Sequence, residues 1–310
     1  MKLFKNVDFM AFRKQLGFIS LLLVIASVGL LLTKGLNLGL DFTGSTVIEV
    51  HSQNDILVED ARDALNGTTF ADAVIQHFGS ARDVVVRVAP QQAEQAAMKA
   101  DEVGLALFAR LQESMPDLEL RRVEFVGPQV GDELRDQSGT AMLVALIMIF
   151  LYVWFRFTNK FGFSAVAALF HDVLIVLGAF SLFSWQVDLT VLAALLALIG
   201  YSINDSIVIA DYVRDTFRTS RKSDPEEVVN DAVHKTLGRT VNTAITTAAV
   251  VLALLLFGGE AVFGFAQALF IGVIVGTYSS IYIVCNIALS MNLNKQDFML
   301  PEQQEIDEMP

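Results

Sequence analysis

Long apolar blocks alternate with polar segments along this chain, and the lengths of the blocks predict its main elements. A helix that crosses a bilayer needs roughly 20 mostly apolar residues. Six blocks meet this requirement, so the sequence predicts six membrane spans: 16–34, 138–156, 163–183, 188–212, 240–258 and 263–291. Basic residues precede the first block and no small-residue cleavage site follows it, so we expect an uncleaved signal anchor.

The segment 35–137, between the first two spans, has the shorter periods of a domain outside the membrane. Alternating apolar and polar residues, as in STVIEVH, predict half-buried strands, and a longer alanine-rich run predicts a helix. This strand, helix, strand, strand, helix, strand order is that of a ferredoxin-like domain. Asn54 and Asp55 are predicted to cap the first helix, and Gly127–Gly131 to form a turn. The expected elements are 45–51, 54–65, 72–79, 81–89, 91–113 and 118–126.

Together these patterns predict a polytopic α-helical membrane protein of six spans with one α+β ferredoxin-like (βαββαβ) domain. Between the fourth and fifth spans, 213–239 is expected to contain a cytoplasmic amphipathic helix, with Asp224 as its cap, Pro225 in its first turn and Gly238 at its end. The other parts are an N-terminal segment, 1–15, the external domain, 35–137, the five later spans within 138–291, and an acidic tail, 292–310.

The positions of lysine and arginine predict the orientation of the spans. Basic residues gather before the first span, between spans two and three, and between spans four and five, whereas 184–188 and 258–262 contain none. Short loops rich in Lys and Arg stay on the cytoplasmic side. Both termini are therefore expected in the cytoplasm and the external domain outside, which in a bacterial inner membrane means the periplasm.

Composition excludes several classes of site. Of the 310 residues, 54% are hydrophobic, which is more than a typical soluble domain has. The formal net charge is −12, and the external domain is acidic, so no surface suits nucleic acid. Cys285 is the sole cysteine, which rules out a disulfide within the chain and a cysteine-based metal site. We find no nucleotide motif, and we expect no bound metal and no cofactor.

Charged residues within the spans are the main functional signal. An aspartate at the centre of a span costs roughly 2.5–3.5 kcal/mol, so such residues face the protein interior or a water-filled cavity. Asp205, in SIND, is the most deeply placed acid, and Arg239 stands at the start of the fifth span. If these spans are neighbours, an Asp205–Arg239 contact can form. Other polar residues in the spans are expected to support this pair: His171, Asp172, Asn204, Asp211 and Thr243.

Two interpretations of Asp205 are open from the sequence. In one, the carboxyl only hydrogen-bonds a neighbouring helix and holds the bundle together. In the other it carries a proton, because a low dielectric favours a neutral acid whereas a nearby guanidinium favours a carboxylate. A group between these influences binds and releases a proton as its surroundings change. For His171 and Asp172 the alternatives are a structural role and support of a proton path.

The last span has a small residue at every fourth position: Gly264, Ala268, Gly272, Gly276 and Ser280. Such a ridge lets two helices approach closely. We therefore expect Gly272 and Gly276 to pack against another span, either in this chain or in another.

Several motifs, in this order, resemble the SecF family, the smaller membrane subunits of the SecDF component of bacterial protein export. LDFTGSTVIEV follows the first span and contains Asp41, Phe42 and Gly44, and VEFVGPQVGDEL precedes the second. ALFHDVLI, LIGYSINDSIVIADYVRD and TLGRTVNTAITT mark spans three, four and five. The resemblance covers nearly the whole chain. The family commonly has a second glycine where this chain has Ser45.

The resemblance implies six spans and one periplasmic domain, related to half of a transporter of the resistance-nodulation-division (RND) superfamily. It implies a SecD partner in an obligate heteromer, association with SecYEG and YajC in the bilayer, and contact with translocating unfolded polypeptide. The proton gradient would supply the energy for late steps of translocation. In this family an aspartate in span four and an arginine at span five are the functional pair, and by motif these are Asp205 and Arg239.

Two other classes of function remain open. A half-subunit of an RND-type proton-driven exporter of small molecules or lipids would share the intramembrane aspartate. Against it, six spans and one small external domain are too little for a complete pump. A purely structural subunit would tolerate neutralisation of every titratable residue in its spans.

Overall fold

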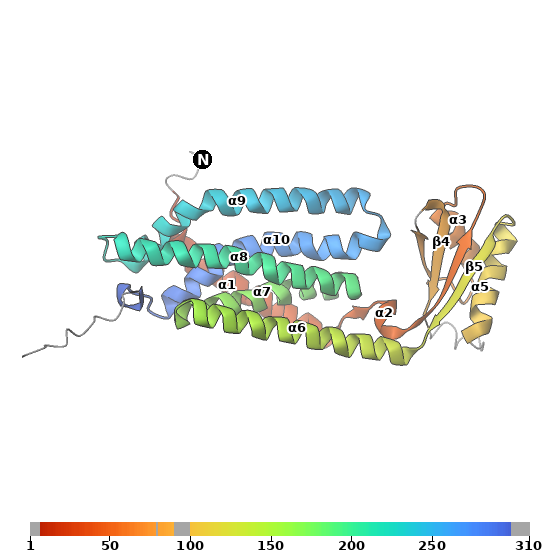
Figure 1. Cartoon of the computed structure of the whole chain (residues 1–310), viewed down its shortest axis with the longest axis horizontal. Helices are drawn as coiled ribbons and strands as arrows, with labels where there is room; N and C mark the ends of the chain where they lie inside the picture. The colour runs from red at the N-terminus through yellow and green to blue at the C-terminus, as the bar shows by residue number, and fades with distance from the viewer. Residues whose placement is uncertain (1–6, 79, 90–99, 299–310) are drawn as a thin grey trace, which may run out of the picture.

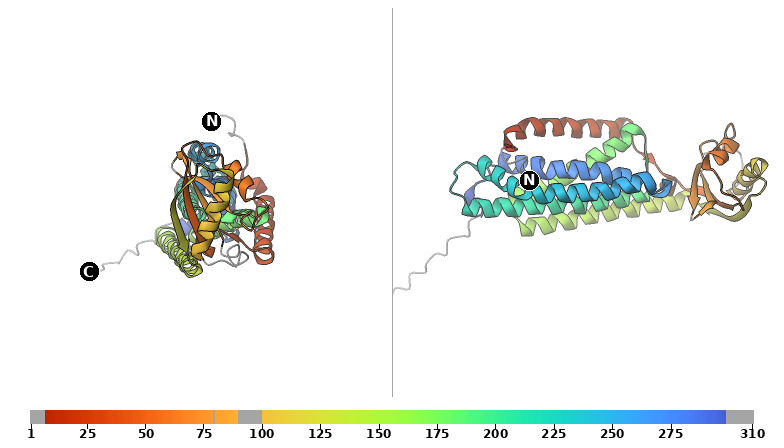
Figure 2. Two further views of the ribbon diagram at one scale, coloured as in Figure 1. Left: turned by 90° about the vertical axis from the view of Figure 1, so that its right-hand side faces the viewer. Right: turned by 90° about the horizontal axis from the view of Figure 1, so that it is seen from above.

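The computed structural model describes residues 7–78, 80–89 and 100–298, and it has two parts joined end to end (Figure 1). Long helices form a bundle, and a small sheet domain lies beside one end of it. Figure 2 shows the same arrangement from two further directions. Parts of the predicted N-terminal segment, of the acidic tail and of the helix 91–113 lie outside the described residues.

Six helices in the described part of the chain are long and apolar enough to cross a membrane, so the predicted six-span class is confirmed. Among them, α10 packs against α7, α8 and α9, and α1 packs on α7 and α10. Short 3-10 helices, η1 (Met10–Phe12) and η2 (Lys295–Phe298), precede α1 and follow α10. The six helices are α1 (Arg13–Thr33), α6 (Pro128–Arg156), α7 (Asn159–Phe183), α8 (Leu189–Thr219), α9 (Pro225–Phe257) and α10 (Glu260–Ser290).

Three helices extend well beyond the apolar blocks that predicted them. α6 begins at Pro128, so the turn expected at Gly127–Gly131 is wrong, and most of this stretch is helical. α8 continues to Thr219 and α9 begins at Pro225, so the separate amphipathic helix expected within 213–239 is wrong as well. Hydropathy detects only the part of a helix that lies in hydrocarbon, and these polar turns continue beyond it.

The beginning of α9 agrees with the sequence, but its continuation does not. Asp224 accepts a hydrogen bond of 3.1 Å from the backbone N–H of Glu226, and Pro225 is the first helical residue. Gly238, the expected end, lies inside the helix, which runs to Phe257. A glycine in a helix interior costs about 1 kcal/mol relative to alanine. Packing of α9 against α8 and α10 offsets this cost.

The sheet domain has the predicted ferredoxin-like order, with four antiparallel strands arranged β3-β4-β2-β5. The cap predicted for its first helix is wrong. α3 begins at Val58, and the backbone N–H of Asn54 instead donates to the hydroxyl of Ser52 at 3.1 Å, in the preceding turn. The elements are β2 (Ser45–His51), α3 (Val58–Leu65), β3 (Val74–Phe78), β4 (Ser80–Val88), α5 (Ala100–Ser114) and β5 (Glu119–Val126).

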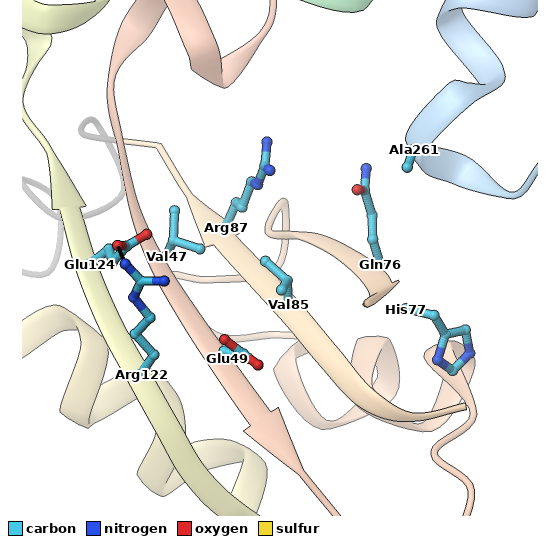
Figure 3. A pocket seen from close by; sticks show the side chains of 9 residues that line it. All are labelled: Val47, Glu49, Gln76, His77, Val85, Arg87, Arg122, Glu124 and Ala261. Carbon is cyan, nitrogen blue, oxygen red and sulfur yellow. Dashed lines mark ion pairs between the residues drawn. The ribbon is translucent and has the colours of Figure 1, made fainter. Parts of the chain in front are cut away.

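Alternation along the strands decides which face of the sheet is covered. Ile48, Val50, Val84 and Val86 are fully buried in a core that they share with residues of α3 and α5. Residues between them, such as Glu49, point to the other face because successive side chains of a strand alternate. This second face, which we call the open sheet face, is turned toward the beginning of α10 (Figure 3).

A short pair of parallel strands joins the sheet domain to the bundle. β1 (Asn37–Leu38), after α1, pairs with β6 (Gln186–Val187), between α7 and α8. α2 (Leu40–Thr43) follows β1 and ends at Gly44, whose φ of 79° is a conformation that glycine adopts readily. Ser45 already belongs to β2. The position at which the family commonly has its second glycine therefore has ordinary strand geometry here, and a serine fits it.

Candidate functional site

A buried carboxylate joins three helices in the interior of the bundle. Asp172, on α7, is fully buried, and its Oδ2 accepts hydrogen bonds from Ser202 of α8 at 2.6 Å and from Ser279 of α10 at 2.8 Å. Its Oδ1 lies 2.9 Å from Nδ1 of His171. A hydrogen bond to a charged group contributes about 1.5–3 kcal/mol. This cluster therefore stabilises the contact between α7, α8 and α10.

Glycines on α10 allow these helices to approach. A Cβ at Gly272 would lie 2.7 Å from Leu198 of α8, and one at Gly276 would lie 3.3 Å from Cβ of Ser202. The same Cβ at Gly276 would lie 3.6 Å from Oδ2 of Asp172. The small-residue ridge thus faces α8 of this chain, which the sequence alone left open.

Asp205 lies beside this cluster but is not part of its hydrogen bonds. It follows Ser202 by three residues on α8, about 21 Å along the helix from Thr219 and about 24 Å from Leu189. Its side chain is buried, with 1% of the residue exposed, and neither carboxyl oxygen has a hydrogen-bond partner among the described residues. An unpaired buried charge is far more costly than a buried neutral acid. The carboxyl therefore needs a proton or a partner from outside this set.

Asp205 and Arg239, for which the sequence allowed a contact, form no hydrogen bond or ion pair with each other in this structure. Arg239 lies on α9, which packs against α8, and its charge is close enough to act on the Asp205 carboxyl. However, no hydrogen bond from the described residues reaches either oxygen of Asp205, and Arg239 is exposed. The sequence located both residues in neighbouring helices. It could not show that Arg239 would be exposed and leave the Asp205 carboxyl without a hydrogen bond from it.

Polar residues are also exposed on the surface of the spans near Asp205. Arg239, Asn242 and Thr246 follow one another at helical spacing on α9, and Asn204 is exposed on α8. Thr243 is used within its own helix, since its hydroxyl donates to the carbonyl of Arg239 at 2.8 Å. Exposed polar groups in a span are costly against lipid. We call these four residues the polar span face.

The remaining predicted polar residues fall into different environments. Nε2 of His171 is buried and has no hydrogen-bond partner within the described chain. Oδ1 of Asp211 lies 2.9 Å from Nη2 of Arg214 and 3.3 Å from Nη2 of Arg156, near the ends of α8 and α6. Asp211 therefore belongs to a group of ion pairs at the end of the bundle, apart from Asp205.

Asp41 links the bundle to the sheet domain. Its Oδ2 accepts a hydrogen bond of 3.3 Å from the backbone N–H of Leu189, the first residue of α8, and its Oδ1 lies 3.5 Å from Nη1 of Arg87 on β4. Asp188 caps the same helix by accepting the N–H of Val191 at 2.9 Å. Carboxylates at a helix N-terminus stabilise the helix. The first residue of the helix that carries Asp205 is thus bound by Asp41, which also pairs with the sheet through Arg87.

Close backbone contacts position Asp41. Its neighbour Phe42 is buried, and a Cβ at Gly131 of α6 would lie 2.6 Å from the Phe42 carbonyl oxygen. A Cβ at Gly39 would lie 2.9 Å from Cβ of Asp188. Only glycine fits at either place. The sequence did not indicate these two glycines or Asp188, because their roles depend on contacts between segments far apart in the chain.

The open sheet face forms a second concave region (Figure 3). A cavity of about 280 Å³ lies between this face and α10, and Arg122 and Glu124 form an ion pair in its wall. Charges of both signs are present, and the described residues contain no group of three or more His, Cys, Asp or Glu that could hold a metal ion. The lining residues are Val47, Glu49, Gln76, His77, Val85, Arg87, Arg122, Glu124 and Ala261.

Six candidate spans, buried acids within them and one ferredoxin-like domain at the end of the bundle define a multi-pass membrane protein of the transport type. Comparison with known families identifies which one. The family described as "Protein export membrane protein SecD/SecF, C-terminal" matches residues 107–294, and the "SecD/SecF GG Motif" matches residues 29–56. The chain belongs to the SecD/SecF family of protein-export membrane proteins.

Individual relatives agree with this assignment. The chain is 44% identical to the protein translocase subunit SecF of Vibrio alginolyticus, over 99% of this chain and 98% of the relative. It is 45% identical to that of Pseudomonas aeruginosa, over 98% of each chain. A crystal structure of SecDF, a translocon-associated membrane protein from Thermus thermophilus, matches with a TM-score of 0.74 and 37% identity. That match covers 94% of this chain but 40% of the SecDF chain, so this chain spans about two fifths of its length.

Proposed function

We propose that this chain is the SecF half of a SecDF-type complex, which uses the proton motive force to promote late steps of protein export through SecYEG. The curated relatives, named as protein translocase subunits, support the export function. By the same family relationship we place the chain in the bacterial inner membrane, with SecD, YajC and the translocating polypeptide as further partners. The distribution of basic residues supports cytoplasmic termini and a periplasmic sheet domain.

The main support for proton-driven function is the environment of the Asp205 side chain. The carboxyl is buried in the middle of a span, its oxygens have no hydrogen-bond partner among the described residues, and the charge of Arg239 lies nearby. Such a group gains or loses a proton when access to water, or the distance to the guanidinium, changes. Asp172, in contrast, is already held by two hydroxyls and an imidazole. We therefore assign the proton to Asp205 and a positioning role to Asp172.

The polar span face supports the need for a second membrane subunit. Arg239, Asn204, Asn242 and Thr246 are exposed in this chain at the level of its spans. A partner with spans of its own would cover them and exclude lipid, as intramembrane polar residues require. This chain matches 40% of the SecDF chain, and we propose that the remainder of that chain corresponds to such a partner.

A mechanical path from Asp205 to the sheet domain is available along α8. Protonation changes the charge in the middle of this helix, and its first residue is bound by Asp41, which also pairs with Arg87 of the sheet. Moving one charge through 100 mV supplies about 2.3 kcal/mol. This is enough to shift a balance between two states that differ by a few kcal/mol. We propose that α8 transmits the change to the periplasmic domain, which then acts on the emerging polypeptide.

The test measures proton-driven completion of translocation in inverted membrane vesicles that contain the whole complex. We expect Asp205→Asn and Arg239→Met to abolish the response to the proton gradient while the complex still assembles. Asp215→Asn is the matched control, because it removes an exposed carboxyl from the same helix and should leave the response intact. A normal response from Asp205→Asn would refute the proton role. Loss of assembly in both variants would assign them a structural role instead.

A further inference from the structure

A basic pocket lies at the end of the bundle away from the sheet domain, where α6, α7 and α8 meet η2. Its cavity of about 240 Å³ is lined by three arginines, Arg156, Arg214 and Arg218, together with Thr158, Asp297 and several aromatic side chains. None of these residues has a part in the proposed proton path.

Few acids pair with the three arginines. Arg156 and Arg214 both pair with Asp211: Oδ1 lies 3.3 Å from Arg156 and 2.9 Å from Arg214, and Oδ2 accepts from Arg156 at 3.4 Å. Arg218 donates through Nε to the carbonyl of Phe298 at 3.0 Å. Asp297 is taken by Lys160 at 2.8 Å. The only other acid paired with the three arginines in the described part of the chain is the exposed Asp215, whose Oδ1 lies 3.8 Å from Nε of Arg214. The pocket therefore carries an excess of positive charge.

Two buried polar atoms in this pocket have no hydrogen-bond partner among the described residues. They are Nε of Arg214, a donor, and the hydroxyl oxygen of Thr158. Thr158 is also the residue that precedes α7, a helix of 25 residues, and its side chain makes no capping hydrogen bond. The first N–H groups of a helix lack partners within the helix and attract anions. Hydroxyl, guanidinium and helix end thus present donors to one cavity.

The outer surface beside the pocket is apolar. Phe155, next to Arg156, is 84% exposed, and Phe163, one turn into α7, is 53% exposed. These side chains lie on two of the membrane-spanning helices. An anion bound in the pocket can therefore have hydrocarbon attached to it on this side. Basic pockets between spans at the cytoplasmic end of a bundle suit acidic lipid headgroups.

We infer that this pocket binds the phosphate of an anionic phospholipid, with Arg156, Arg214, Arg218 and Thr158 around the headgroup and acyl chains along Phe155 and Phe163. The lipid would fasten α6, α7 and α8 together at one end. Among the described residues, the three arginines and the Thr158 hydroxyl make no hydrogen bond or ion pair with Asp172 or Asp205, so this site can be tested apart from the proton role of Asp205.

The test titrates lipid into the full-length chain in detergent and follows thermal unfolding, using phosphatidylglycerol and, as a lipid without net charge, phosphatidylcholine. We expect phosphatidylglycerol to bind the wild-type chain more tightly. Arg214→Gln should weaken its binding about fivefold, since one basic residue contributes about 1 kcal/mol to attraction of anionic lipid. Arg221→Gln is the control, because it removes an exposed positive charge from the nearby loop. Equal losses from both variants would overturn the site in favour of general surface attraction.

Thr158→Val gives a second test that does not change the charge. Its hydroxyl has no hydrogen-bond partner within the described part of the chain, so the stability of the lipid-free chain should not fall. Phosphatidylglycerol binding should weaken about two- to tenfold. Unchanged lipid binding would overturn the proposed contact. Inorganic phosphate alone should not reproduce the stabilisation, and an equal effect of phosphate would assign the pocket to a free anion.

Crosslinking with a photoactivatable phosphatidylglycerol tests the site on the wild-type chain, without relying on variants that fold poorly. On the wild-type chain, label should concentrate on peptides that contain Phe155 or Phe163. Label spread evenly over the spans would contradict a defined lipid site.

Discussion

Ser202 on α8 donates a hydrogen bond of 2.6 Å to Asp172 on α7, and it stands less than one helical turn before Asp205. One carboxyl of this pair of acids is therefore fully engaged, while the other has no hydrogen-bond partner among the described residues. This contrast distinguishes a structural role from a proton-carrying role, which the sequence alone left open for both acids. Asp172 fixes the place of α8, and Asp205 is left available to change its state.

Replacing Asp172 should mainly lower the stability of the helix bundle. Asp172→Leu leaves the hydroxyl of Ser202 buried without its acceptor, at a cost of about 1–3 kcal/mol. The hydroxyl of Ser279 also loses its bond to Asp172 but keeps the Gly276 carbonyl at 3.1 Å, so its loss should cost less. Asp172→Asn keeps one acceptor oxygen, so its thermal stability in detergent should lie between that of Asp172→Leu and the wild type.

Ser290→Ala is the matched control for these variants. Its hydroxyl is exposed and donates only to the Asn286 carbonyl in the same helix, so the variant should keep the stability of the wild type. A melting temperature of Asp172→Leu equal to that of the wild type would show that the cluster adds nothing to stability.

A larger side chain at Gly276 should separate α10 from α8. A Cβ there would lie 3.3 Å from Cβ of Ser202, which is tighter than an ordinary contact, and the branches of valine would press on the Asp172 cluster. We expect Gly276→Val to destabilise the bundle by about 1–3 kcal/mol, as overpacking of a core does. Gly29→Val, at a glycine of α1 with open space around its Cβ position, should cost less. Equal melting temperatures for these two valine variants would contradict the close approach.

The sequence was sufficient for the spans because each must satisfy its backbone hydrogen bonds within hydrocarbon, and a long apolar block has few other structures available. It was also sufficient for the ferredoxin-like order, since alternation in β2 and β4 directly reflects burial on one face. It failed at the ends of α6, α8 and α9. The residues at those ends are polar, so hydropathy does not detect them. A single glycine such as Gly238 does not end a helix either.

The site was only partly predictable for a related reason. Cost in the bilayer makes Asp172, Asp205 and Arg239 conspicuous in any sequence, but it does not give the direction of a side chain. The exposure of Arg239 depends on how α9 packs on α8, and the role of Ser279 depends on the position of Asp172 on a different helix. The predicted ridge includes the next residue, Ser280, but not Ser279, so the spacing of small residues was not a signal for it.

The sheet domain should show a local dependence on acid. Asp83 accepts a hydrogen bond from Ser80 and lies 2.6 Å from Nδ1 of His51, and these contacts hold the pKa of its carboxyl below the ordinary value of 3.8. A carboxyl whose pKa is lowered by folding contributes stability above its unfolded pKa, and this is lost as the pH falls through the folded pKa. The contribution should therefore be complete at neutral pH and disappear below about pH 4.

Carbon-13 NMR of labelled aspartates in the full-length chain can check this dependence. Ser80→Ala should raise the pKa of Asp83, because it removes the largest cause of the shift. Asp72→Asn, which removes another exposed carboxyl of the domain, should leave it unchanged. An Asp83 pKa that does not move in Ser80→Ala would contradict the assigned hydrogen bond.

Asp41→Asn should loosen the connection between the sheet domain and α8 without unfolding either part. The variant loses the ion pair with Arg87 and the charge at the beginning of α8, and each of these partly exposed interactions is worth at most about 1 kcal/mol. Hydrogen exchange at the N–H of Gly39, which bonds to Val187 in the same junction, should become faster. Asp55→Asn is the control: its ion pair with Arg82 has the same 3.5 Å separation but does not reach the bundle.

If α8 transmits the protonation state of Asp205 to the sheet domain, Asp41→Asn should also reduce proton-driven translocation in vesicles, and Asp55→Asn should not. Faster exchange at Gly39 with full translocation activity would show that the junction is flexible yet not the route of coupling, and the path along α8 would have to be abandoned.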